Sequence, residues 1–155
     1  MHQRLGHRSV KSYIQSGNIV FSAKGSAEAI ARRVAAEFVK EFGFAAKVLV
    51  VAAERWRTIV QGNPYAKFAA GSPKTVHLGI CAGEPGAERL KALLARTGGR
   101  ERFEIGEGIV YLHAPDGFGT SKFAAGMEKA CGVAMTVRNW RTVEAIGRMV
   151  NGGND

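Results

Sequence analysis

The sequence predicts an α+β protein with two related halves. Two hairpin patterns, in residues 10–22 and 102–113, consist of β-branched and aromatic segments around a glycine-containing turn. Each hairpin is followed by a segment with helical periodicity and then by a short apolar segment. With 155 residues, 46% of them hydrophobic, the chain is long enough to bury a core.

The first hairpin pairs Val10–Gln15 with Ile19–Ser22. Gly17-Asn18 between them supplies residues that tolerate positive φ and predicts a two-residue type II′ turn. That turn places Ile14 opposite Phe21 in the hairpin register.

A helix is expected from the N-cap Ser26 to about Phe42, where Gly43 ends it. Lys47–Val51 predicts a short apolar strand, and Glu54–Val60 a helical turn. The apolar residues of the first helix recur every four positions: Ile30, Val34, Phe38 and Phe42. The first half therefore has the order β-β-α-β-α.

Residues 65–73 carry glycine, alanine and serine without strong periodicity and are the candidate junction between the halves. The second half then has the order β-α-β-β-α-β-α. Its expected elements are a strand at 75–81, a helix at 87–95, strands at 102–105 and 109–113, a helix at 121–130, a strand at 133–137 and a helix at 142–150.

The β-α-β-β-α-β order is that of the ferredoxin-like split β-α-β pattern. The second half contains all of it, whereas the first half lacks the opening strand and most of the first helix. The sequence thus predicts two tandem ferredoxin-like halves, residues 1–72 and 73–155, of which the first is incomplete at its N-terminus.

Composition limits the environment and the partners. The 22 basic and 13 acidic residues give a net charge of +9, which favours anionic partners, although the basic residues are scattered as on an ordinary solvated surface. Cys81 and Cys131 lack metal or redox spacing and are expected to be buried free thiols, with a disulfide left open. Since no segment approaches ~20 apolar residues and no signal peptide is evident, we expect a cytoplasmic protein with no membrane contact.

A glycine-rich turn between a strand and a helix is the candidate anion site. Gly117 and Gly119 precede a hydroxyl N-cap, Ser121, and a cation, Lys122, and such a turn directs backbone N–H groups and the helix dipole toward an anion. The order differs from a Walker P-loop. Arg138 at a following strand end suits a phosphate or carboxylate, although Asp116 would satisfy it internally. Further polar contributors are Gln15, Asn18 and Asn139, the last of which is also a natural N-cap before the core anchor Trp140.

Other chemistry has weaker support. Tyr111 and His113 share one sheet face, where aromatic residues could stack RNA bases or be covered by the other half of the chain. His113 with Asp116 could form an acid–base couple, but a solvated strand-end histidine is favoured. Metal-ligand spacing and known nucleophile motifs are absent, so no metal, no cofactor and no catalytic residue is assigned, and enzymatic activity stays open.

Several strings together resemble one bacterial family, domain of unknown function 1697. They are Tyr13-Ile14-Gln15-Ser16-Gly17-Asn18, Asn63-Pro64-Tyr65, Tyr111-Leu112-His113, Pro115-Asp116-Gly117-Phe118-Gly119-Thr120-Ser121-Lys122 and Thr136-Val137-Arg138-Asn139-Trp140-Arg141-Thr142-Val143. The resemblance implies no activity, because the family is named for lacking one. Members open with an apolar strand and a Leu-Arg-Gly-Ile-Asn-like string that this sequence lacks, so we expect an N-terminally truncated member.

The predicted function is the binding of an anionic ligand, either a nucleotide, a phosphorylated metabolite or a nucleic acid, at the glycine-rich turn. The alternative is a non-catalytic structural or protein-interaction module, in which the same residues only cap helices and fix turns. An enzyme acting on a phosphorylated metabolite is the third hypothesis.

Overall fold

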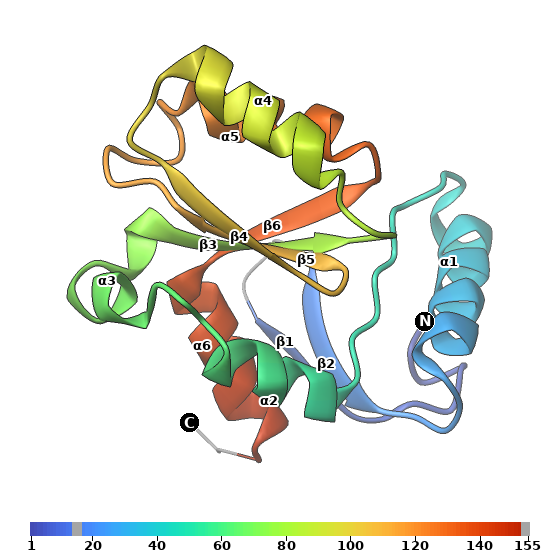
Figure 1. The fold of residues 1–155 in the computed structure, drawn as a ribbon. Coiled ribbons are helices and arrows are strands. Elements are labelled where there is room, and N and C mark those ends of the chain that lie inside the picture. Colours follow the sequence, from blue (N-terminus) through green and yellow to red (C-terminus); the bar gives the residue numbers. More distant parts are fainter. Residues whose placement is uncertain (14–16, 153–155) are drawn as a thin grey trace. The chain divides into compact units, whose positions relative to one another are not determined.

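The computed structural model describes residues 1–13 and 17–152 and confirms an α+β protein (Figure 1). Its strands form a two-stranded sheet, β1-β2, and a four-stranded sheet, β4-β5-β3-β6. The chain divides into two compact units, one of residues 62–144 and one of residues 1–61 with 145–155. Among the described residues, none of the helices combines the length and apolar character needed to cross a membrane.

The unit of residues 62–144 is built on the four-stranded sheet, which is antiparallel throughout. Its strands are β3 (Val76–Cys81), β4 (Arg102–Gly106), β5 (Ile109–His113) and β6 (Met135–Asn139). With α4 (Ala87–Thr97) and α5 (Lys122–Cys131), they follow the β-α-β-β-α-β order predicted for this region. In this order β3 occupies a central position between β5 and β6.

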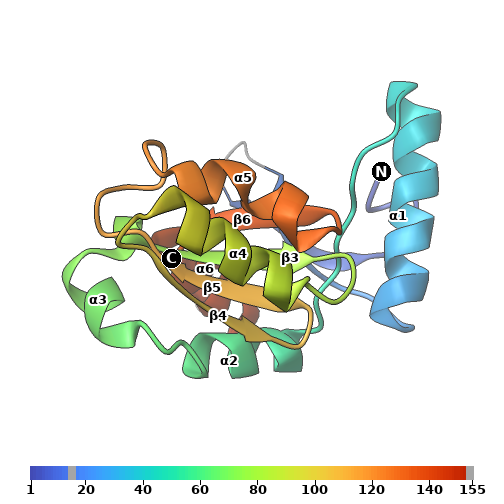
Figure 2. The same cartoon turned by 45° about the horizontal axis from the view of Figure 1, so that its top comes forward.

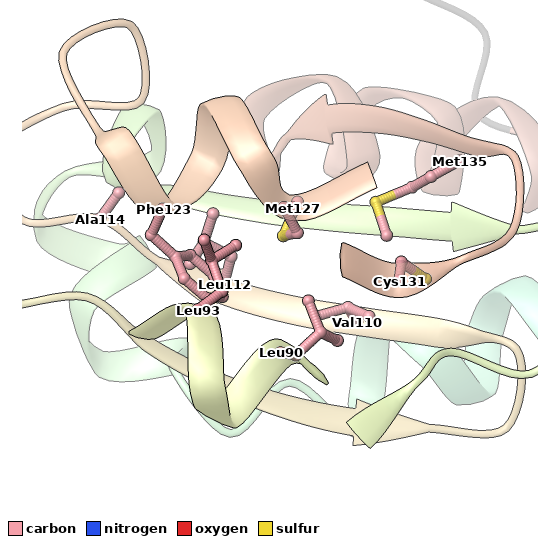
Figure 3. Close-up of a cluster of buried hydrophobic side chains, with 9 residues drawn as sticks. All are labelled: Leu90, Leu93, Val110, Leu112, Ala114, Phe123, Met127, Cys131 and Met135. Atoms are coloured by element: carbon pink, nitrogen blue, oxygen red, sulfur yellow. The ribbon is translucent and has the colours of Figure 1, made fainter. Parts of the chain in front are cut away.

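Helices α4 and α5 lie side by side over one face of this sheet (Figure 2). Gly126 on α5 permits the close approach, since a Cβ there would lie 3.2 Å from the methyl carbons of Leu93 on α4. Beneath the helices, Leu93, Leu112 and Phe123 point toward one another (Figure 3). The complete core cluster is Leu90, Leu93, Val110, Leu112, Ala114, Phe123, Met127, Cys131 and Met135.

The opposite face of the sheet is also buried. Tyr111 and His113 are each 7% exposed, while Val110 and Leu112 face the core under α4 and α5, which confirms the alternation predicted for this strand. Trp140, the first residue of α6 (Trp140–Val150), is 3% exposed and lies near Tyr111, with ring centroids 6.4 Å apart. Trp140 is therefore a core anchor, as predicted.

The candidate junction, residues 65–73, contains α3 (Ala66–Gly71), which the sequence did not predict, and leads into a 3-10 turn at Pro73–Thr75. The backbone N–H of Tyr65 donates to Asn63 Oδ1 at 2.9 Å, so the Asn63-Pro64 turn starts the helix. Alanine at three of the six helical positions favours the helix despite the weak hydrophobic periodicity of the segment.

In the other unit, helix α1 (Ala27–Phe42) has the predicted ends. Ser26 Oγ accepts from the N–H of Ala29, and Gly43, with φ of +78°, caps the C-terminus. Ile30 and Val34 are buried as predicted, but Phe42 is 52% exposed. A strict four-residue spacing advances about 40° per step around a helix, so three steps carry Phe42 away from the buried face.

The predicted hairpin register is wrong by four residues. In β1 (Arg8–Tyr13) and β2 (Asn18–Ser22), Tyr13 pairs with Asn18 and Lys11 with Val20. Asn18 therefore belongs to a strand and not to a two-residue turn, and its Nδ2 donates to Tyr13 O at 3.2 Å. Because the shift is an even number of residues, Tyr13 and Val20 still share a face.

The strand predicted at Lys47–Val51 is absent, since the described residues 45–52 contain neither helix nor strand. Apolar character alone does not make a strand, because a ladder also needs a neighbour with matching backbone groups. The helical turn predicted next is confirmed as α2 (Ala53–Gln61). From α2, Arg57 Nε donates to Oδ1 of Asn151, the residue that follows α6, at 2.8 Å.

Candidate functional site

Two consecutive turns bring the chain from β5 into α5. The N–H of Gly117 donates to Ala114 O at 3.0 Å, and the N–H of Ser121 donates to Phe118 O at 3.2 Å. Gly117 has φ of +101°, a backbone conformation that residues with a Cβ rarely adopt. The glycine in this turn thus has a conformational role whether or not a ligand binds.

Ser121 is committed to two internal hydrogen bonds. As the N-cap of α5, its Oγ accepts from the N–H of Ala124 at 3.0 Å. The same hydroxyl donates to Glu101 Oε1 at 2.5 Å, and Ser121 is 7% exposed. The Ser121 hydroxyl, which the sequence assigned to an external anion, therefore bonds to a carboxylate of the same chain.

Asp116 is also engaged inside the chain. Arg100 donates to both of its carboxylate oxygens, from Nε to Oδ2 at 3.0 Å and from Nη2 to Oδ1. These hydrogen bonds from Arg100 lower the pKa of Asp116. Thr120 Oγ1 donates to the backbone oxygen of Asp116 at 3.1 Å and closes the turn. Asp116 is therefore not the internal partner that the sequence suggested for Arg138.

Gly119 and Lys122 are the solvent-facing members of the candidate site. Both are exposed, and a Cβ on Gly119 would meet nothing within 4 Å. Lys122 is the first residue of α5. A ligand approaching from solvent would therefore reach the backbone of Gly119 and the ammonium group of Lys122 before the buried hydroxyl of Ser121.

The structure does not bring Arg138 to this turn. Arg138 pairs with Leu78 and shares the sheet face of Tyr111, opposite the face that α4 and α5 cover. It is half-buried, its Nη1 donates to the backbone oxygen of Val137 at 2.9 Å, and burial lowers its pKa. Asn139, on the neighbouring position, accepts from the N–H of Thr142 at 3.1 Å and caps α6 as predicted.

The two polar contributors proposed in the first hairpin have different outcomes. Asn18 is 8% exposed and bonds to the backbone of the hairpin, so its amide serves the local structure. Gln15 lies outside the described residues.

His113 is not the solvated strand-end histidine that the sequence favoured. Its ring stacks on Phe68 of α3 with centroids 4.0 Å apart, and Tyr65 lies 5.9 Å away. Burial, followed by the charge of Arg102, lowers the pKa of His113, and burial raises the pKa of Tyr65 to about 12. The hypothesis of an acid–base couple between His113 and Asp116 is wrong, because Asp116 is bonded to Arg100. Tyr111 and His113 are buried, so they do not form an open surface on which bases could stack.

Sequence reasoning missed Glu101, the partner of Ser121. Glu101 lies 20 positions before Ser121, and its Oε2 is buried without a hydrogen-bond partner. No local pattern connects a glutamate before one strand with the helix that follows the next strand. Within the part of the chain that the structure describes, no group of three or more histidine, cysteine, aspartate or glutamate side chains could hold a metal ion.

The fold is α+β, and the residues at the N-terminus of α5 are bonded to other residues of the chain. A family model described as "Protein of unknown function (DUF1697)" matches residues 1–111. The chain therefore belongs to this family, which confirms the resemblance found in the sequence. No curated protein matches it.

A solved structure supports the fold. The conserved bacterial protein SP0830 from Streptococcus pneumoniae is 17% identical and superposes with a TM-score of 0.72. The similarity covers 96% of this chain and 84% of the other. At this level of identity, the likeness concerns the fold alone.

Proposed function

We propose that this protein is a non-catalytic interaction module that binds an extended segment of a partner protein as an added strand on β2. The observation that supports this proposal is the two-stranded sheet, in which β2 has a strand neighbour on one side only among the described residues. On its unpaired side, an edge strand offers backbone N–H and C=O groups to another chain.

The second half supports the choice of the position that an added strand would take beside β2. In the second half, β3 lies between β5 and β6 and pairs with both. The corresponding elements of the first half are β2 and the apolar residues 47–51, which form no strand. If residues 1–72 and 73–155 are tandem ferredoxin-like halves, as we propose, one added strand would pair with both elements.

The other edge of the small sheet is less suited to strand addition. β1 contains a register irregularity between Arg8 and Lys11, and Ser9 has φ of +51°. Bulges and lysines on an edge strand oppose pairing with further strands. β2, with the sequence Asn-Ile-Val-Phe-Ser, has no charge and no proline. The net charge of +9 favours a segment with acidic flanking residues.

A labelled peptide provides the test. The probe carries the sequence of residues 76–81, with serine in place of cysteine and two glutamates at each end, because β3 fills the corresponding position in the second half. We expect saturable binding by fluorescence anisotropy, slower amide exchange in residues 19–22, and no binding of a scrambled peptide. Absence of binding, or protection of the edge strand β4 instead, would contradict the proposal.

Two variants locate the binding edge. Ile19 on β2 is 39% exposed and Val10 on β1 is 41% exposed, so they form a matched pair of exposed apolar side chains. Ile19→Lys should weaken peptide binding at least ~10-fold because a lysine opposes strand addition. Val10→Lys should change it less than ~2-fold, and equal effects of the two variants would place the peptide elsewhere.

Anion binding at the glycine-rich turn is the second candidate function. It is supported by the exposed Lys122 in the first turn of α5, together with the net charge of +9. In this proposal Gly119 and Lys122 hold a phosphate group of a nucleotide, a phosphorylated metabolite or a nucleic acid. Gly117 shapes the turn, and Ser121 keeps its bond to Glu101.

Thermal shift with inorganic phosphate and ATP, and mobility shift with a mixed oligonucleotide at several salt concentrations, test this candidate. Lys122→Gln should abolish any stabilisation or shift, whereas Lys129→Gln should preserve it, since Lys129 is an exposed lysine in the last turn of the same helix. Equal responses of both variants would indicate nonspecific charge attraction.

A further inference from the structure

Two thiols that are 50 positions apart in the sequence meet inside the unit of residues 62–144. Cys81 Sγ and Cys131 Sγ are 3.8 Å apart, and both cysteines are free thiols. A disulfide bond is about 2.05 Å long, so closure requires the sulfurs to approach by ~1.8 Å, which is within reach of small side-chain rotations.

The backbone on both sides of this pair is held in place. Cys81 is the last residue of β3, and its N–H donates to Gly108 O at 2.9 Å. Cys131 is the last residue of α5, and its backbone oxygen accepts from the N–H of Gly86 at 2.9 Å. The N–H of Ala82 donates to Ala134 O at 2.8 Å, which joins the segments that follow the two cysteines. The contact between the sulfurs is thus fixed by paired backbone rather than by mobile loops.

The two thiols differ in accessibility. Cys131 is 1% exposed and belongs to the core cluster, where Figure 3 shows it at the same end as Met135. Cys81 is only partly buried. An oxidant arriving from solvent therefore meets Cys81 first, and Cys131 is positioned to react with the product.

We propose that Cys81 and Cys131 form an oxidation site at which a hydroperoxide converts the two thiols into an intramolecular disulfide. The Cys81 thiolate attacks one oxygen of hydrogen peroxide, the O–O bond breaks, hydroxide leaves, and Cys81 becomes a sulfenic acid. The Cys131 sulfur then attacks Cys81 Sγ, the S–O bond breaks, and the oxygen leaves as water. In total two thiols and one peroxide give one disulfide and two waters.

The reaction is expected to be slow at neutral pH. Burial, together with the neighbouring Cys131 thiol, raises the pKa of Cys81 to about 12, so the thiolate is scarce. The product would join the end of β3 to the C-terminus of α5 and close a loop of about 50 residues, which stabilises the folded state.

The test uses the full chain, reduced, desalted and treated with hydrogen peroxide at pH 8.5. We expect the intact mass to fall by ~2 Da through loss of two hydrogens, with recovery after dithiothreitol. Non-reducing digestion should yield one peptide pair joined through Cys81 and Cys131. The melting temperature of the oxidised chain should rise by ~5–10 °C.

Two variants assign the roles. Cys131→Ser should leave Cys81 without a partner, so that it gains ~16 or ~32 Da as sulfenic or sulfinic acid. Cys81→Ser should keep its reduced mass over the time in which the wild-type chain reacts. A wild-type chain that gains oxygen, forms intermolecular dimers or stays at its reduced mass overturns the proposal.

Discussion

Removal of the Ser121 hydroxyl tests whether the N-terminus of α5 is a structural or a ligand-binding feature. In Ser121→Ala the helix loses its N-cap, which costs about 1 kcal/mol. Glu101 also loses the hydroxyl that donates to it. Leaving a partly buried carboxylate oxygen without its donor costs ~1–3 kcal/mol, toward the lower end here because Glu101 is only half-buried. We therefore expect the free energy of unfolding to fall by about 2 kcal/mol.

Equilibrium unfolding in urea measures this loss. Thr120→Ala is the matched control, since Thr120 is the adjacent hydroxyl, is exposed and donates to the backbone oxygen of Asp116. It should cost less than ~0.5 kcal/mol. A double-mutant cycle with Glu101→Ala should show a coupling of about 1 kcal/mol. The structural role of Ser121 is refuted if Ser121→Ala costs no more than Thr120→Ala or if the coupling is zero.

Three further predictions concern stability. Phe123→Ala, at a fully buried position in the core cluster, should lower the free energy of unfolding by ~3–5 kcal/mol in urea titrations. Burial lowers the pKa of His77 from 6.5 to about 4, so the stability that the neutral ring contributes is present above pH 6.5 and is lost as the pH falls toward 4. The free energy of unfolding of the wild type should therefore fall between pH 7 and pH 4 by about 3 kcal/mol more than that of His77→Phe. An equal fall in both proteins would show that His77 does not cause the pH dependence. Amides of residues 18–22 should exchange faster than those of 109–113, because a two-stranded ribbon is less stable than a central strand; the reverse order would contradict the difference between the sheets.

The sequence predicted the second half well because its signals are local and agree with one another. Ser121 and Asn139 cap the helices that follow them, as their residue types predicted. Alternation along β5 also placed its side chains on the correct faces. In each case a residue interacts with positions within a few residues of itself, which a single sequence displays directly.

The first half was predicted less well because the features that were mispredicted depend on which segments pair with each other in the folded chain. The observed hairpin register differs from the predicted one by four residues, because Asn18 pairs with Tyr13 in the strands although Gly17-Asn18 has the sequence of a two-residue turn. Lys47–Val51 has the composition of a strand, but strand formation requires a partner, and composition says nothing about one. α3 was missed for the opposite reason, since a short helix can form without strong hydrophobic periodicity.

The candidate site shows the same limit in its chemistry. A glycine-rich turn with a hydroxyl cap has the same sequence whether its anion is external or belongs to the chain, and here Ser121 bonds to Glu101. Two unit charges about 4 Å apart interact by ~4 kcal/mol at an effective dielectric constant of about 20, so a phosphate beside Ser121 would be repelled by the Glu101 carboxylate. Any anion that binds here must therefore approach from the side of Lys122 and Gly119. Lys122→Gln then affects binding with little effect on stability, whereas Ser121→Ala affects stability first, and this contrast separates the two roles of the turn.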